Sequence, residues 1–209
     1  MALDSIVAIV EGNGEVKAVP ELLRRLLDIR KRFDIEISKP PINAHGRGNI
    51  TKPNGLENFL RVAEKRPDCK AILVLMDAER DCAKDVAQKL ALRARNLITH
   101  IAIAVVAPNH MFENWFLASL ETLAGKRGLE ANLPTVNNPE SIGNPKKWLT
   151  EHMGPGRIYK ENLDQVAMSA LINTDFVKQR SRSFRRLEHA LDELLAIMAN
   201  EESPKVTPA

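Results

Sequence analysis

The sequence lacks the cysteines, the long apolar runs and the aromatic residues on which several classes of protein depend. Its two cysteines, Cys69 and Cys82, cannot build a disulfide framework or a four-cysteine zinc site, which favours a reducing, cytoplasmic location. No apolar run is long enough to cross a bilayer, and no basic region precedes a cleavable apolar segment at the N-terminus. We therefore expect neither a membrane partner nor a secretory signal. Aromatic residues make up 4% of the chain, which argues against a stacking platform for single-stranded nucleic acid.

The overall charge and composition are those of an ordinary globular domain. A net charge of +3 is too small to indicate nucleic-acid binding by itself, so that argument depends on where basic residues cluster. With 209 residues and a hydrophobic fraction of 44%, the chain can form one domain with a sizeable core and an appended subdomain. It has no Gly-x-x-x-x-Gly-Lys-Ser/Thr phosphate loop, the motif with which many ATPases bind nucleotide.

Apolar segments typical of strands alternate with amphipathic helical segments along the first part of the chain. The predicted strands span residues 4–10, 33–38, 70–76 and 101–106, and a helical stripe follows each of the first three. Near-continuous apolar runs are typical of strands buried on both faces. This pattern predicts an α/β fold: a Rossmann-like, mainly parallel sheet flanked by helices in residues 1–124. A helical C-terminal extension packed on this core is expected in residues 125–200, and a flexible tail in residues 201–209.

Acidic residues lie at or past the ends of three of the predicted strands: Glu11 and Glu15, then Asp77, Glu79 and Asp81, then Glu113. Because the carboxyl ends of neighbouring parallel strands lie at one edge of a sheet, these side chains are expected to converge. Crowded carboxylates repel one another, and a divalent cation relieves that repulsion. Oxygen ligands without cysteine or paired histidine suit Mg²⁺ or Mn²⁺. Each acid taken singly could end a strand or cap a helix, but their joint position favours a metal site.

Basic residues gather in two segments. The polar loop 43–54 contains His45 and Arg47, which could reach a phosphate, although a flexible surface loop is the simpler interpretation. Arg180, Arg182, Arg185 and Arg186 lie close together before and within the last predicted helix. Such a cluster either contacts nucleic-acid phosphates or forms a solvated face, and the sequence leaves both readings open.

The order of these motifs resembles a known domain. An apolar strand ending in Glu-Gly, with a second glutamate four residues after the first and a later strand ending in an acidic run, resembles the TOPRIM domain. That domain occurs in topoisomerases, primases and nucleases of the overcoming-lysogenization-defect (OLD) type. More closely, the chain is similar to the bacterial family called domain of unknown function 4276. The matching segments are Glu11-Gly12-Asn13-Gly14-Glu15, Asp77-Ala78-Glu79-Arg80-Asp81, Glu113-Asn114-Trp115, Tyr159-Lys160 and Ser181-Arg182-Ser183-Phe184-Arg185-Arg186.

The resemblance implies a TOPRIM-like fold and a nuclease that hydrolyses phosphodiesters with Mg²⁺ or Mn²⁺. It places Glu11 in acid/base chemistry or metal binding and Asp77 in metal binding. It further implies a glutamate and a lysine at the site, for which Glu113 and Lys160 are the candidates. The catalytic set is then Glu11, Asp77 and Lys160, and the metal set is Glu11, Glu15, Asp77, Glu79, Asp81 and Glu113.

The resemblance also implies partners. Similar proteins often work beside a separate ATPase in bacterial defence against phage, with nucleic acid, and DNA in particular, as the expected substrate. A homo-oligomer is compatible with this reading. Two alternatives stay open at this stage. One is a non-catalytic binding or regulatory subunit of such a complex, and the other is a small-molecule phosphotransfer enzyme.

Overall fold

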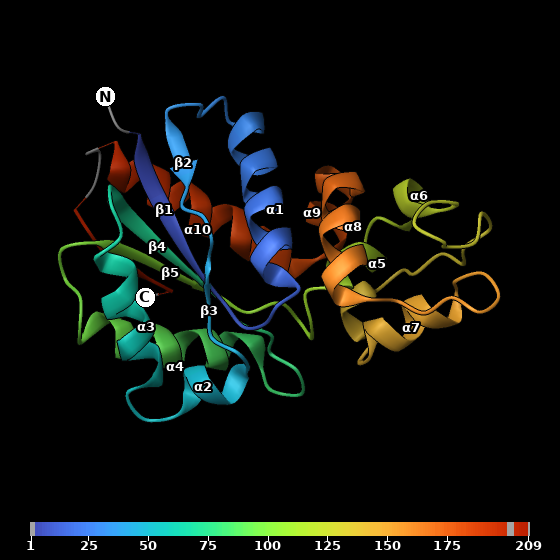
Figure 1. Ribbon diagram of the computed structural model, residues 1–209, viewed down its shortest axis with the longest axis horizontal. Helices are drawn as coiled ribbons and strands as arrows, with labels where there is room; N and C mark the ends of the chain where they lie inside the picture. The colour runs from blue at the N-terminus through green and yellow to red at the C-terminus, as the bar shows by residue number, and fades with distance from the viewer. Residues whose placement is uncertain (1–2, 200–202, 209) are drawn as a thin grey trace.

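A parallel sheet forms the centre of the molecule in the computed structural model, which describes residues 3–199 and 203–208 (Figure 1). Its strands are Asp4–Val10 (β1), Ile35–Ile37 (β2), Ile42–Asn43 (β3), Cys69–Leu75 (β4), Ala102–Val106 (β5) and Val206–Thr207 (β6). The described strands are ordered β2-β1-β4-β5-β6, and β3 also pairs with β1. Every strand pairing in this sheet is parallel. The predicted α/β fold with a mainly parallel sheet is confirmed.

Helices cover both faces of the sheet. Glu15–Ile29 (α1) and Arg182–Met198 (α10) pack on one face, whereas Gly55–Glu64 (α3) and Ala83–Arg95 (α4) pack on the other. Because successive strand residues point to opposite faces, β4 contributes Leu73 and Leu75 to the α1/α10 core and Val74 to the α3/α4 core. Met76 packs on the α3/α4 side, so the residue after it, Asp77, begins the turn from the opposite side.

The helix α10 shows how the sequence pattern becomes a packed layer. Phe184, Leu187, Leu191 and Leu194 recur at three- and four-residue spacing, and all are buried against the sheet. Burying each such side chain contributes about 1.5–3 kcal/mol. The helix begins where the Ser181 hydroxyl oxygen accepts a hydrogen bond of 3.0 Å from the Phe184 N–H.

Between β5 and α10 the chain makes a helical excursion, which Figure 1 shows gathered at one end of the molecule. Arg47–Thr51 (α2) belongs to the core, and the excursion contains Asn114–Leu117 (α5), Leu120–Leu123 (α6), Pro139–Ser141 (η1), Pro145–Glu151 (α7), Glu161–Gln165 (η2), Val166–Leu171 (α8) and Thr174–Arg180 (α9). Its α8 packs on α1. The Arg25 guanidinium reinforces this contact by donating a hydrogen bond of 2.8 Å to the Ile172 carbonyl. A domain boundary near residue 124 stays a prediction.

Two details differ from the sequence expectations. Val206 and Thr207, expected in a flexible tail, form β6 on β5 and are 7% and 4% exposed. Without β6 the edge of β5 would be unpaired, and the Thr207 hydroxyl also donates a hydrogen bond of 2.7 Å to Glu193. The second strand is shorter than predicted, because Phe33 lies before it and is 67% exposed. No helix in the described ranges is long and apolar enough to span a membrane.

Candidate functional site

Three strand ends are tied together by backbone-to-carboxylate hydrogen bonds. Glu11, directly after β1, accepts a hydrogen bond of 3.2 Å at Oε2 from the Asp77 N–H. Asp77, just past β4, in turn accepts one of 2.9 Å at Oδ1 from the N–H of Phe112, which lies past β5. The convergence expected from a parallel sheet is therefore present for these acids. Asp77 is 7% exposed and Glu113, next to Phe112, is fully buried.

Glu15 joins this group because its side chain turns back across the glycine turn. Its Oε2 accepts a hydrogen bond of 2.7 Å from the Gly12 N–H, so Glu15 satisfies a backbone donor at the beginning of α1. Gly14 permits a close approach from the helical excursion: a Cβ at this position would lie 2.2 Å from Oε1 of Gln165. The two glycines of the motif thus allow the turn and the excursion to meet over the strand end.

Glu113 is held from the excursion side. Its Oε1 accepts hydrogen bonds of 3.0 Å from the Tyr159 hydroxyl and 3.2 Å from Gln165 Nε2. The Lys146 ammonium lies 4.0 Å from the same oxygen and 2.6 Å from Oε1 of Glu161. The other carboxylate oxygen, Glu113 Oε2, is buried and has no hydrogen-bond partner among the described residues. An unsatisfied buried carboxylate oxygen is costly, which marks this position for a ligand or a proton.

Burial and the charges around it raise the pKa of Glu11 to about 7. Burial is the largest cause, and the negative charges of Glu15 and Glu79 add to it. The hydrogen bond from the Asp77 N–H and the positive charge of Arg47 act in the opposite direction. Glu11 can therefore gain or lose a proton near neutral pH, which is the range required of a general acid or base.

The pKa values of the buried acids Asp77 and Glu113 are also raised. Burial and the nearby charge of Glu113 raise the pKa of Asp77 well above its usual value. Burial raises the pKa of Glu113 to about 7, although Lys146 and the Tyr159 hydroxyl oppose the shift. The same negative surroundings raise the pKa of the Lys146 ammonium, so it stays charged. One cation thus faces several carboxyl groups, and the cluster favours either bound protons or an additional positive charge.

The donor set fits a divalent cation in chemistry and charge. Glu11, Glu15, Asp77 and Glu113 offer only oxygen ligands, which suit Mg²⁺ or Mn²⁺, and Glu113 Oε2 is free to accept one. The described residues do not, however, contain three or more His, Cys, Asp or Glu side chains already spaced to enclose an ion. Mg²⁺ sites commonly use one or two carboxylates and retain several waters, so such an ion does not need all four acids as direct ligands.

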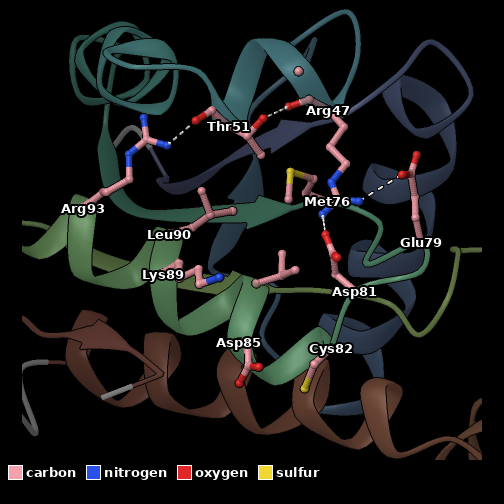
Figure 2. A pocket seen from close by; sticks show the side chains of 12 residues that line it. Arg47, Thr51, Met76, Glu79, Asp81, Cys82, Asp85, Lys89, Leu90 and Arg93 are labelled. Carbon is pink, nitrogen blue, oxygen red and sulfur yellow. Dashed lines mark hydrogen bonds and ion pairs between the residues drawn. The ribbon is translucent and has the colours of Figure 1, made fainter.

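Glu79 and Asp81, also predicted as metal ligands, pair with an arginine instead. Arg47 Nη1 lies 2.9 Å from Oε2 of Glu79, and its Nη2 forms an ion pair with Asp81 (Figure 2). Glu79 has a φ of 52°, in the left-handed region, and its N–H donates a hydrogen bond of 2.8 Å to the His110 carbonyl. Glu79 and Asp81 line a cavity of about 830 Å³ between α2 and α4. The acidic run after β4 is therefore divided between two sides of the sheet.

The lysine predicted at the site lies elsewhere. Lys160 lines a separate cavity with Arg127 and Arg157, and its contact with Asp164 is through the backbone N–H, 2.9 Å from Oδ2. Lys146, and not Lys160, lies beside Glu113, where a lysine was expected. The sequence offered a weak signal, because Lys146 follows Asn144-Pro145 at the beginning of a helix, but only the fold brings that helix next to Glu113.

The four predicted nucleic-acid-binding arginines differ in availability. Arg180 lies 2.7 Å from Glu121, Arg185 donates to the backbone carbonyls of residues 178 and 179, and Arg186 lies 3.9 Å from Glu193. Arg182 is exposed and makes no hydrogen bond or ion pair within the described residues. Arg182 is thus the member of the cluster best placed for a phosphate.

Comparison with known proteins gives one family and one solved structure. The profile of the family described as "Domain of unknown function (DUF4276)" matches residues 10–192. The chain also resembles the "C-terminal region of the Burkholderia pseudomallei OLD protein", with 16% sequence identity and a TM-score of 0.46. That match covers 93% of this chain and 100% of the other. No match was found among curated proteins.

Proposed function

Since the chain belongs to the family described as Domain of unknown function (DUF4276), whose description carries no activity, we propose from the site itself that it is a metal-dependent nuclease of TOPRIM type. The observation that carries the proposal is the convergence of Glu11, Asp77 and Glu113 from three strand ends onto one buried site. Structural clusters of this kind are destabilising unless something compensates them, so their presence favours a functional role. The Glu-Gly motif and the acidic strand end, which resemble TOPRIM sequences, support the same reading.

Glu11, Asp77 and Glu113 would hold the cation, with Glu15 as a further donor. A bound Mg²⁺ or Mn²⁺ would supply a Lewis acid and lower the pKa of water for attack on a phosphodiester. A residue of the chain accepts the proton that the attacking water releases. In hydrolysis the oxygen of water bonds to phosphorus, the bond from phosphorus to the leaving oxygen breaks, and the leaving oxygen takes up a proton from solvent. The water proton passes to the Glu11 carboxylate and from there to solvent.

Lys146 acts as a positioning residue. Its ammonium bridges Glu113 and Glu161 and offsets part of their charge. The Tyr159 hydroxyl fixes one oxygen of Glu113, which leaves Oε2 directed to a ligand. Burial and the charge of Glu113 raise the pKa of Tyr159, so its hydroxyl stays protonated and acts as a donor. This argues against a tyrosine nucleophile.

The experiment that tests the proposal is a plasmid-nicking assay. Purified protein is incubated with supercoiled DNA and Mg²⁺ or Mn²⁺, and the wild type is compared with Glu11→Ala and Asp77→Ala. Glu151→Ala serves as the matched control, because Glu151 is an exposed acid paired with Lys147. Metal-dependent nicking that is lost in both site variants and retained in the control is expected. No cleavage with either metal would contradict the proposal for the isolated chain.

A non-catalytic binding subunit is the second candidate, and one observation favours it. The acids of the described chain are not preformed into a metal cage. In that case the protein would bind nucleic acid or a partner ATPase without cleaving it, and Asp77→Ala would leave this binding unchanged. The separate ATPase and the role in phage defence stay predictions that rest on the resemblance.

A further inference from the structure

Arg47 forms contacts that an incoming anion could replace. We call Arg47, with its partners Glu79 and Asp81, the clamp. Its guanidinium forms ion pairs with Glu79 and Asp81 and donates a hydrogen bond of 3.3 Å to the Ala78 carbonyl. Figure 2 shows Arg47, Glu79 and Asp81 at one end of the cavity between α2 and α4. The partners are exposed, with side-chain exposures of 46% for Glu79 and 62% for Asp81. The Arg47 side chain is only 19% exposed, but its carboxylate partners remain solvated. Ion pairs with solvated carboxylates are weak, so a competing anion can displace them.

The clamp is connected to the carboxylate site. The N–H of Gly46, the residue before Arg47, donates a hydrogen bond of 2.8 Å to the carbonyl of Glu11. Glu79 lies two residues after Asp77 in the same turn. The charges of Glu79 and Arg47 both act on Glu11, in opposite directions. The clamp and the site therefore share one strand-end region and one electrostatic field.

The cavity next to the clamp can receive a ligand. Its volume of about 830 Å³ falls within the range of small-molecule sites, about 300–1,000 Å³. Met76, Val86 and Leu90 provide apolar walls. The charged lining consists of three acids, Glu79, Asp81 and Asp85, and three cations, Arg47, Lys89 and Arg93. Lys89 is exposed and makes no ion pair or hydrogen bond in the described ranges.

The third cation of the cavity is not available for a ligand. Arg93 donates to both oxygens of Glu57, at 2.8 and 2.6 Å, and to the carbonyls of residues 50–52. These contacts join α4 to α2 and α3 and leave Arg93 a structural role. The cations that an incoming phosphate could engage are thus Arg47 and Lys89.

Resting on the proposed function, we propose that Arg47 is a phosphate-operated latch on Glu79. Without a ligand, Arg47 holds Glu79 on the cavity side. A backbone phosphate of a nucleic-acid strand entering the cavity takes over the guanidinium, for which a bidentate anion is a suitable partner. Glu79 is then released toward Glu11 and completes the oxygen ligands of the carboxylate site. Full cation binding is in this way coupled to the presence of substrate.

The first test measures Mn²⁺ affinity without nucleic acid, by electron paramagnetic resonance of free Mn²⁺. Arg47→Ala is expected to bind Mn²⁺ about three- to fivefold more tightly than the wild type, because Glu79 is free. Adding Glu79→Gln to Arg47→Ala should abolish the gain, whereas adding Asp81→Asn, which removes the same charge from the other partner of Arg47, should retain most of it. Equal effects of these two second substitutions would show that only net charge acts and would overturn the latch, as would the absence of any gain.

The second test measures binding of the phosphate backbone in the presence of EDTA, by fluorescence anisotropy of a labelled oligonucleotide of twelve thymidine nucleotides. Arg47→Ala should weaken binding about three- to fivefold. The matched control is Arg24→Ala, which removes an exposed arginine paired with Asp28 on α1 and should leave both measurements unchanged. Tighter Mn²⁺ binding together with weaker oligonucleotide binding is a combination that simple loss of structure would not produce. Unchanged oligonucleotide binding in Arg47→Ala would overturn the proposal.

Asp77→Asn separates the latch from the function on which it rests. If the wild type binds Mn²⁺, Asp77→Asn does not, and Arg47→Ala matches the wild type, the carboxylate site stands and the latch is wrong. If neither the wild type nor Arg47→Ala binds Mn²⁺, both proposals fail.

Discussion

Asp77 and Glu79 are separated by one residue, yet the two side chains lie in opposite surroundings. Asp77 is buried, accepts a backbone N–H and has a pKa raised by burial and by neighbouring acids. Glu79 is 46% exposed and is neutralised by Arg47. The acidic run after β4 thus places Asp77, which forms no ion pair with an arginine in the described residues, on one side of the sheet and Glu79 and Asp81, which pair with Arg47, on the other. The position of each acid relative to the sheet decides which kind of site it forms.

The surroundings of the two acids also differ in their effect on the stability of the fold. Ion pairs such as that of Arg47 with Glu79 contribute little, but they cost little. A buried group of carboxyls with a single nearby lysine costs free energy, since burial and mutual repulsion both disfavour the charged forms. Proteins retain such arrangements where they serve a ligand or a reaction. We therefore place the chemistry on the Asp77 side.

Replacing one acid at a time by its amide tests most directly whether the two sides of the sheet differ in function. Asp77→Asn is expected to slow metal-dependent plasmid nicking by about 100-fold or more, since even the loss of a group that only supports a metal ligand costs about 10–100-fold. Asp81→Asn, at the exposed ion pair, should change the rate by less than about threefold. The rates of conversion of supercoiled to nicked plasmid give the measurement. Equal losses in the two variants would show that the two sides are not distinct.

Two adjacent lysines test the energetic part of the comparison. Lys146→Ala leaves Glu113 and Glu161 without their cation and should lower the free energy of unfolding by about 1–3 kcal/mol at pH 8, a value reduced from the 3–5 kcal/mol of fully buried pairs because Lys146 is partly exposed. Lys147→Ala removes only an exposed pair with Glu151 and should cost less than about 0.5 kcal/mol. Urea unfolding measures both, and at pH 5.5 the difference should shrink. A Lys146→Ala variant as stable as Lys147→Ala at pH 8 would contradict the assignment.

The pH dependence of stability follows from the raised pKa values. Glu11 and Glu113 have a pKa of about 7 in the folded protein against the usual 4.5, so the folded state binds more protons between these values. Their contribution is fully present below about pH 4.5 and is lost as the pH rises through 7. The free energy of unfolding without metal should therefore fall between pH 5 and pH 8, by on the order of 1–3 kcal/mol.

Glu113→Gln provides the control for this pH dependence. The variant should show a shallower fall and exceed the wild type in stability at pH 8, because the amide carries no charge to bury. Mn²⁺ should raise the stability of the wild type at pH 8, since a ligand of the folded state stabilises it. Urea unfolding monitored by circular dichroism at each pH provides the measurement. A wild-type stability that rises over this pH range would contradict the protonation states inferred for the site.

The sheet and its acidic edge could be predicted because they depend on local pattern. Uninterrupted apolar runs such as Ala71–Leu75 indicate strands buried on both faces, and a parallel sheet puts the ends of such strands at one edge. Glu11, Asp77 and Glu113 could be found in this way because each directly follows a strand or its loop. The short strand β6 could not, because two residues are too few to show a period.

The partners of the acids could not be predicted, because they come from distant segments. Lys146 and Tyr159 reach Glu113 from the helical excursion, and no spacing in the sequence reports that contact. The sequence places Arg47 in a polar loop, but its pairing with Glu79 depends on the position of that loop after β3, which lies beside β1. Charge type is readable from the sequence, whereas charge compensation is a property of the tertiary structure.

The same distinction applies to cations and yields the smallest expected effect. Arg182 is unpaired in the described part of the chain, whereas Arg180 is engaged by Glu121 and by the Ala118 carbonyl. Arg182→Ala should weaken binding of a fluorescein-labelled DNA duplex about two- to fivefold and reduce the slope of log affinity against log salt by about 1. Arg180→Ala should leave the slope unchanged, because its charge is already compensated. Anisotropy titrations from about 50 to 200 mM KCl give both slopes. Equal slopes in the two variants would mean that ion pairing does not decide which arginine meets the phosphates.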